Sequence, residues 1–133
     1  YYFPFLGVNL NMNNILIVDD SSVSRLKLYN LLRDNDYNLY EAKNLNAVKN
    51  NLFSDNITLN DINLILLDLH LKGQSGLDLL DYLNENHSNI PVMMVSGEGK
   101  KEKVIETIKS GAKDYLLKPF EEKILLDKIT KLL

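Results

Sequence analysis

The sequence predicts an α/β domain in which five parallel strands form one sheet and helices cover both of its faces. Two observations support this prediction. Short apolar runs alternate with amphipathic stretches from residue 15 to the end of the chain, and this alternation favours parallel strands joined by crossover helices. The chain has 133 residues and no cysteine, and this length suits one domain that buries its own core without disulfides.

The first half of the chain is predicted to form two strands and two helices. Residues 15–18 are a branched apolar run that is typical of a buried strand. Ser21 and Ser22 can cap a helix that continues to about residue 33. We expect a weaker strand at residues 37–41 and a helix at 45–53, followed by a polar surface loop over the segment 54–61.

The middle of the chain predicts a third strand and a third helix. Residues 64–67 are apolar throughout, as expected of a central strand that is covered on both faces. A glycine-containing turn at 72–75 leads into a helix whose apolar face recurs every three or four residues. That face consists of Gly76, Leu79, Leu80 and Leu83.

The last part of the chain predicts two more strands and two more helices. Residues 92–95 and 115–117 are the fourth and fifth strands, and they end at Ser96 and Lys118. The helix between them, at about 100–110, is predicted to end at Gly111 and to bury Val104, Ile105 and Ile108. The final helix has an apolar face formed by Leu125, Ile129, Leu132 and Leu133.

Residues 1–11 differ from the rest of the chain. They are rich in aromatic residues, contain Pro4 and Gly7, and lack the basic start of a signal peptide. We predict that they lie outside the fold, as a cloning remnant or an upstream translated stretch, which leaves 12–133 as the domain. The alternative is an apolar arm that docks on a partner or on a second copy.

The composition excludes several classes of function. The formal net charge is −3, from 15 basic and 18 acidic residues, so no overall basic bias points to direct nucleic-acid binding. No apolar run approaches the roughly 20 residues that a membrane span needs. The absence of cysteine excludes disulfides and thiol nucleophiles. We therefore expect a soluble, cytoplasmic protein.

Polar groups end four of the five predicted strands. They are the pair Asp19 and Asp20, then Asp68, Ser96 and Lys118. Ligands bind to open parallel sheets at the carboxyl ends of the strands, in the crevice where the strand order reverses. If the first, third, fourth and fifth strands are neighbours, these side chains converge.

Three clustered carboxylates repel one another, and a hard divalent cation relieves that repulsion. Mg²⁺ prefers carboxylate, water and phosphate oxygens, with Mn²⁺ as a plausible substitute. His70 and His87 are far apart in sequence and offer no cluster of imidazoles. An ammonium and a hydroxyl beside the cation would suit phosphoryl transfer, with a carboxylate as the nucleophile.

Four motifs carry a resemblance to a known family. They are ILIVDDS at 15–21, LILLDLHLKGQSG at 64–76, MMVSGEG at 93–99 and DYLLKPF at 114–120. Their order and spacing resemble the receiver domains of bacterial two-component response regulators, of the chemotaxis-regulator type, over about residues 12–133. The resemblance implies a flavodoxin-like, doubly wound five-stranded sheet with strand order 2-1-3-4-5 and five helices.

The resemblance also implies a role for each strand-end residue. Asp68 would be the phosphoacceptor and Lys118 would pair with the phosphoryl group. Asp20 would bind Mg²⁺ directly, together with Asp68 and the main-chain carbonyl of His70. Asp19 would act on the metal largely through a coordinated water.

The family further implies a switch and partners. Ser96 would move toward the phosphoryl group while Tyr115 swings inward, and the surface of the fourth helix, fifth strand and fifth helix would bind a downstream protein. A sensor histidine kinase or a histidine phosphotransfer protein would donate the phosphoryl group, and phosphorylation could drive homodimerisation. The bond between Lys118 and Pro119 is expected to be cis.

The chain departs from the family pattern at several positions. Many members have Pro where Lys72 stands and Met where Gln74 stands, so we expect a more mobile loop after the phosphoacceptor. Gly97 replaces the usual Ala, which would loosen the switch hydroxyl or widen the pocket. His70 and Glu98 occupy variable positions that, in this family, tune the lifetime of the phosphate.

Other interpretations compete with the phosphoacceptor. An Asp pair after a strand is by itself usually a helix cap or a turn, and Tyr115 can be a strand tyrosine without a moving part. The leading hypothesis is a binding module, not an enzyme, that catalyses only its own phosphorylation and dephosphorylation. The alternatives are the receiver part of a longer regulator with a DNA-binding or enzymatic output domain, an aspartyl-phosphate hydrolase with His70 as its acid, and a flavin binder.

Overall fold

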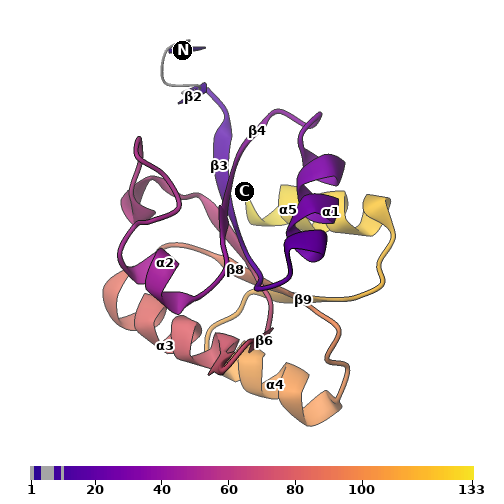
Figure 1. Cartoon of the computed structure of the whole chain (residues 1–133). Coiled ribbons are helices and arrows are strands. Elements are labelled where there is room, and N and C mark those ends of the chain that lie inside the picture. The colour runs from indigo at the N-terminus through magenta and orange to yellow at the C-terminus, as the bar shows by residue number, and fades with distance from the viewer. Residues whose placement is uncertain (1, 4–7, 10) are drawn as a thin grey trace.

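The computed structural model describes residues 2–3, 8–9 and 11–133 and contains a five-stranded parallel sheet (Figure 1). The order of its strands is β4-β3-β5-β8-β9, which is 2-1-3-4-5 when these five strands are counted along the chain. The predicted fold class and order are therefore confirmed. The strands are β3 (Asn13–Val18), β4 (Tyr37–Ala42), β5 (Leu64–Leu67), β8 (Val92–Ser96) and β9 (Asp114–Leu117).

Five α-helices in the described part of the chain cover the two faces of this sheet. Figure 1 shows α1 and α5 on one face and α2, α3 and α4 on the other. Serine caps two of them: Ser21 accepts a hydrogen bond from the N–H of Ser24 at the start of α1, and Ser75 does the same for Leu77 in α3. The helices are α1 (Ser22–Leu32), α2 (Leu45–Lys49), α3 (Gly76–Asn86), α4 (Lys101–Lys109) and α5 (Glu122–Leu132).

Alternate residues of each central strand point into different cores. In β3, Leu16 and Val18 pack with residues of α2 and α3, whereas Ile15 and Ile17 pack with residues of α1 and α5. All four residues of β5 are buried. This alternation explains the continuous apolar runs, because a parallel strand with helices on both sides has no face toward water.

The segment after β4 differs from the prediction. The helix predicted at 45–53 stops at Lys49, because Asn51 takes a left-handed backbone conformation with φ of 52°. The side chain of Asn51 then accepts a hydrogen bond from the N–H of Leu59. Leu59 begins the 3-10 helix η1 (Leu59–Asp61) and is buried, so the segment 54–61 is anchored to the core and is not a purely polar loop.

The buried face of α4 was also predicted wrongly. Ile105 and Ile108 are 41% and 45% exposed, and the residue that α4 buries is Thr107. Thr107 satisfies its hydroxyl by donating to the carbonyl of Val104. The inward stripe is thus Val104 and Thr107, three residues apart, and the two isoleucines face outward.

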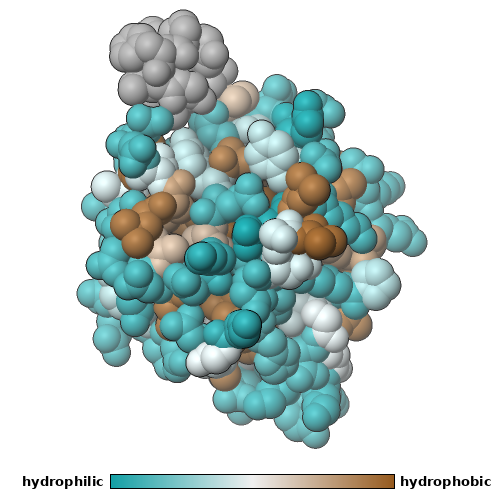
Figure 2. All heavy atoms as spheres, viewed as in Figure 1, coloured by the Kyte–Doolittle hydropathy of each residue, from teal (hydrophilic) through white to brown (hydrophobic). Residues whose placement is uncertain are grey.

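On the side seen in Figure 2, hydrophobic residues form several separate patches on a mostly hydrophilic surface.

The predicted tail is only partly described. β1 (Tyr2–Phe3) pairs with β2 (Val8–Asn9) in a separate two-stranded antiparallel sheet, and residues 1, 4–7 and 10 lie outside the described residues. The placement of 1–11 outside the fold therefore stays a prediction. In the part of the chain that is described, no helix has the length and apolar character needed to cross a membrane.

Candidate functional site

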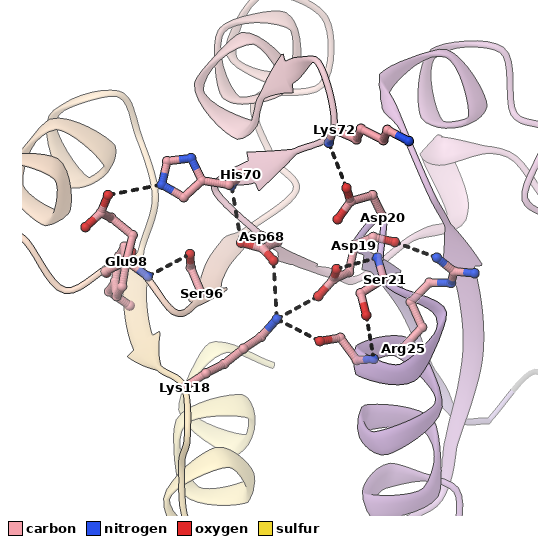
Figure 3. A network of polar contacts seen from close by, with 12 residues as sticks. Asp19, Asp20, Ser21, Arg25, Asp68, His70, Lys72, Ser96, Glu98 and Lys118 are labelled. Carbon is pink, nitrogen blue, oxygen red and sulfur yellow. Dashed lines mark hydrogen bonds and ion pairs between the residues drawn. The ribbon is translucent and has the colours of Figure 1, made fainter.

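The polar residues at the strand ends meet at one edge of the sheet (Figure 3). Asp19 follows β3, Asp68 follows β5 and Lys118 follows β9, while Ser96 is the last residue of β8. Main-chain hydrogen bonds continue the sheet to this point: the N–H of Asp68 donates to Val18 at 2.9 Å and that of Lys118 to Ser96 at 2.8 Å. The convergence predicted from the strand order is thus present.

The ammonium of Lys118 is the centre of this arrangement. Its Nζ lies 2.7 Å from Oδ2 of Asp19 and 3.3 Å from Oδ2 of Asp68, and it donates to the hydroxyl of Ser24 at 3.1 Å. Burial by itself would lower the pKa of Lys118, but the hydrogen bond to Asp19 and the charges of Asp68 and Asp19 outweigh it and raise the pKa. Lys118 is therefore firmly cationic.

Asp19 is buried, and both its carboxylate and its main-chain carbonyl accept hydrogen bonds. It is 2% exposed, its Oδ1 accepts from the N–H of Ser21, and its carbonyl accepts from the Arg25 guanidinium at 2.7 Å. The same guanidinium pairs with Glu41 of β4 at 3.2 Å. Ser24 and Arg25 were not predicted as site residues; the available signal was their place in the first turn of the helix that Ser21 caps.

Asp20 points away from Lys118, toward the loop after the phosphoacceptor candidate (Figure 3). Its Oδ2 accepts a hydrogen bond of 2.8 Å from the main-chain N–H of Lys72. That residue lies in a hairpin of β6 (His70–Leu71) and β7 (Gln74–Ser75), and the side chain of Gln74 accepts from the N–H of Leu45 in α2.

These contacts bear on the expectation of a more mobile loop, which stays a prediction. Proline at position 72 would have no N–H to offer Asp20, and methionine at position 74 has no strong acceptor for Leu45. The two departures from the family pattern therefore each add a hydrogen bond that ties the loop to its surroundings.

Within residues 2–3, 8–9 and 11–133, no three carboxylate or imidazole side chains are grouped as a ready metal cluster. The cause is local, since Lys118 lies between Asp19 and Asp68 while Asp20 is turned to Lys72. The donor set nevertheless fits Mg²⁺, because every ligand that the site offers is an oxygen. The backbone N–H of His70 donates to Oδ1 of Asp68 at 3.2 Å; the ligand role of its carbonyl stays a prediction.

A second network runs through Glu98 beside the pocket. The hydroxyl of the fully buried Ser96 accepts from the N–H of Glu98 at 3.2 Å, and the hydroxyl of Tyr115 donates to the Glu98 carbonyl at 2.5 Å. The two predicted switch residues thus contact the same residue. Burial raises the pKa of Tyr115, opposed by the hydroxyl of Ser96 and reinforced by nearby carboxylates.

The carboxylate of Glu98 reaches across the pocket to His70. Oε1 lies 3.1 Å from Nε2 of His70, and this hydrogen bond is the largest reason that the pKa of Glu98 is lowered. The family resemblance gave both residues a role in the lifetime of the phosphate. It gave no sign that they pair, because His70 lies in β6 and Glu98 in the loop after β8, 28 residues apart.

Gly76 lets the next helix start against the acceptor strand. Its N–H donates to the carbonyl of Leu69 at 2.7 Å, and a Cβ at this position would lie 2.5 Å from the carbonyl oxygen of Asp68. Only glycine permits this approach without a shift of the backbone.

Comparison with known proteins supports the resemblance to the receiver domains of response regulators. The family model for the response regulator receiver domain matches residues 15–130. The Chemotaxis protein CheY of Pseudomonas aeruginosa is 36% identical over 121 residues, which cover 89% of this chain and 94% of that protein. The crystal structure of a response regulator from Thermotoga maritima superposes with a TM-score of 0.77 at 28% identity, over 91% of this chain and 97% of that one.

A longer relative is similar too. The Nitrogen assimilation regulatory protein NtrX of Azorhizobium caulinodans is 36% identical over 110 residues, which cover 81% of this chain and 23% of that protein. The likeness thus extends both to regulators of about the length of this chain and to one in which the matching part is a minor share.

Proposed function

The chain belongs to the response-regulator receiver family, and from this premise we propose that Asp68 accepts a phosphoryl group in a two-component phosphorelay. The donor is a phosphohistidine of a sensor kinase or of a histidine phosphotransfer protein. Membership of the family implies interaction with histidine kinases and with downstream targets, and we place the protein in the cytoplasm with them.

One observation carries the proposal: the Lys118 ammonium lies between the carboxylates of Asp19 and Asp68 at the carboxyl ends of the strands. Lys118 holds Oδ2 of Asp68 and supplies positive charge at the place where phosphoryl oxygens would gather. Phosphoryl transfer depends mostly on such positioning and charge neutralisation. Lys118 would therefore supply the positive charge that the chain itself brings to phosphoryl transfer.

In the step itself, a carboxylate oxygen of Asp68 forms a bond to phosphorus while the phosphorus–nitrogen bond of the donor breaks. The donor imidazole leaves with the electron pair and takes a proton from solvent. Asp19, Asp20, Asp68 and the carbonyl of His70 would hold Mg²⁺, or Mn²⁺ in its place. The cation, when bound, supplies neutralisation of the charge on the phosphoryl oxygens.

The output is a change in a protein-binding surface. Ser96 and Tyr115 both contact Glu98, so a shift of the Ser96 hydroxyl toward the phosphoryl group would free Tyr115 to turn inward. The face of α4, β9 and α5 would then bind a target protein or a second copy. Its exposed Ile105, Ile108 and Leu117 support such a role.

The test is phosphorylation by a small donor. Incubation with Mg²⁺ and acetyl phosphate should add one phosphoryl group by mass spectrometry. Asp68→Ala should gain none, whereas Asp55→Ala, which alters an exposed carboxylate in the loop after α2, should react normally. An equal adduct on the Asp68 variant would refute the assignment, and multiple turnover of a phosphomonoester would favour a hydrolase instead.

A second candidate function is that of the receiver part of a longer regulator. The match to the nitrogen assimilation regulator, of which the aligned part is 23%, favours it. The phosphoacceptor chemistry would be the same, and the output would pass to a DNA-binding or enzymatic domain. Sequencing the gene beyond the codon for Leu133 distinguishes the two.

A further inference from the structure

The two ends of α4 are attached to the rest of the molecule in different ways. At the N-terminal end, Oε2 of Glu98 accepts a hydrogen bond of 3.2 Å from the N–H of Lys100, the N-cap residue of the helix. The main chain of Glu98 in turn contacts the hydroxyls of Ser96 and Tyr115. This end of α4 is therefore coupled to the two residues of the proposed switch.

The C-terminal end of α4 is fastened to α3, which lies beside it on the same face of the sheet (Figure 1). The side-chain amide of Asn84, in the last turn of α3, donates a hydrogen bond to the main-chain carbonyl of Ser110, the C-cap residue of α4. Carbonyls at the end of a helix lack a partner within the helix, so a side-chain donor satisfies this one. Just beyond, the N–H of Ala112 donates to the carbonyl of Thr107 at 3.0 Å, and both of these residues are buried.

Gly111 makes room for the contact between the two helices. Its φ is 107°, in the left-handed region that favours glycine after a helix. A Cβ at this position would lie 2.7 Å from Oδ1 and 2.9 Å from Nδ2 of Asn84, so a larger residue would push the amide away from Ser110. Asn84 and Gly111 thus act together, and we call this pair the α4 clamp.

Helix α3 connects the α4 clamp to the acceptor strand. The first residue of α3, Gly76, donates its N–H to the carbonyl of Leu69, next to Asp68, and the last turn of the same helix carries Asn84. Between these points, the apolar face of α3 is buried in the core. The α4 clamp therefore has a fixed position relative to Asp68, whereas the N-terminal end of α4 is tied to Glu98.

We propose that the α4 clamp is a fixed pivot: phosphorylation of Asp68 tilts the helix by moving its N-terminal end while Ser110 stays in place. A helix that is fixed at one end and moved at the other through Glu98 turns about the fixed end and does not slide along its axis. The exposed Ile105 and Ile108 turn with it, so their orientation toward a target changes. The movement rests on the proposed function, whereas the α4 clamp itself belongs to the unphosphorylated protein.

The α4 clamp is tested first without any phosphodonor. Asn84→Ala removes the amide donor, and its matched control is Asn86→Ala, because the side chain of Asn86 donates to Tyr82 within α3. Both variants gain the same helix propensity in α3. Loss of the hydrogen bond to Ser110 should let the end of α4 open more often, so the amides of Ser110 and Ala112 should exchange with deuterium about fivefold faster in the Asn84 variant. The same rates in both variants would overturn the α4 clamp.

The pivot is tested by distances between spin labels. The chain has no cysteine, so two introduced cysteines give one labelled pair. A label at Asn30→Cys on α1, across the sheet, is paired either with Lys101→Cys at the start of α4 or with Lys109→Cys at its end. Treatment with Mg²⁺ and acetyl phosphate should change the distance to position 101 and leave the distance to position 109 as it was. With Asn84→Ala added, the distance to position 109 should change as well.

The outcomes separate the pivot from the proposed function. Equal changes at positions 101 and 109 while Asn84 is present would overturn the pivot. Mass spectrometry of the same samples shows whether Asp68 carries the phosphoryl group. A normal adduct without a change at position 101 removes the pivot alone. An absent adduct overturns the proposed function and the tilt with it, while the exchange rates still decide the α4 clamp.

Discussion

Replacement of Lys118 by methionine removes the charge at the centre of the pocket and keeps most of the side chain's bulk. At 2.7 Å from Asp19, the ammonium gains about 6 kcal/mol of Coulomb attraction at an effective dielectric constant of about 20. Desolvation of both partners offsets part of this. Asp19, only 2% exposed, would be left without its cation, and loss of one partner of a buried pair costs about 3–5 kcal/mol. Because Lys118 itself is 23% exposed, we expect about 3 kcal/mol of destabilisation.

Urea unfolding followed by circular dichroism measures this loss. The matched control is Lys123→Met on the exposed side of α5, which should change the free energy of unfolding by no more than about 0.5 kcal/mol. Mg²⁺ should raise the midpoint of Lys118→Met more than that of the unchanged protein, because a bound cation replaces the missing charge. A Lys118 variant as stable as the Lys123 variant in the absence of metal would refute the reasoning.

Two further predictions concern the same edge of the sheet. Gly76→Ala forces a Cβ to 2.5 Å from the carbonyl oxygen of Asp68, so it should cost about 2 kcal/mol in the urea assay and slow phosphorylation by acetyl phosphate. Gly97→Ala, where a Cβ meets nothing within 4 Å, should leave the urea midpoint unchanged. The pKa of Lys118 is raised in the folded protein, so its stabilisation is complete below the unfolded pKa of about 10.4 and is lost as pH rises through the higher folded pKa. The stability difference between the unchanged protein and Lys118→Met should therefore shrink at strongly alkaline pH, and a constant difference would contradict the shift.

The fold could be predicted correctly where a strand or helix has a clear hydrophobic pattern in its own sequence. Residues 64–67 are apolar without interruption, and the structure buries all four on both sides of β5. The errors arose where packing between elements decides. In α4 the apolar Ile105 and Ile108 face outward because the contact with the sheet edge falls on the stripe of Val104 and Thr107. No helical period distinguishes these two faces before the position of the sheet is known.

The site was predictable to the extent that strand ends define it. Asp19, Asp68 and Lys118 each end a strand, and the topology brings them together. The groups that hold them in place were not predictable in the same way. The partner of Asp20 is a backbone N–H, and every residue except proline has one, so the sequence cannot single it out. The pair of His70 and Glu98 depends on how the β6–β7 hairpin and the loop after β8 approach each other.

The donors of the pocket explain why three acids can lie together and why phosphorylation should need a cation. Asp19 has Lys118 and the N–H of Ser21, Asp68 has Lys118 and the N–H of His70, and Asp20 has the N–H of Lys72. Each of the three carboxylates thus has hydrogen-bond donors for its single negative charge, and Asp19 and Asp68 share the ammonium of Lys118. A phosphoryl group brings a charge of about −1.5 to −2 at neutral pH, while residues 2–3, 8–9 and 11–133 offer no second ammonium among the donors of these carboxylates. The added charge therefore requires a divalent cation. Asp20 is the only one of the three acids that Lys118 does not contact, so its negative charge is the one most available to bind this cation.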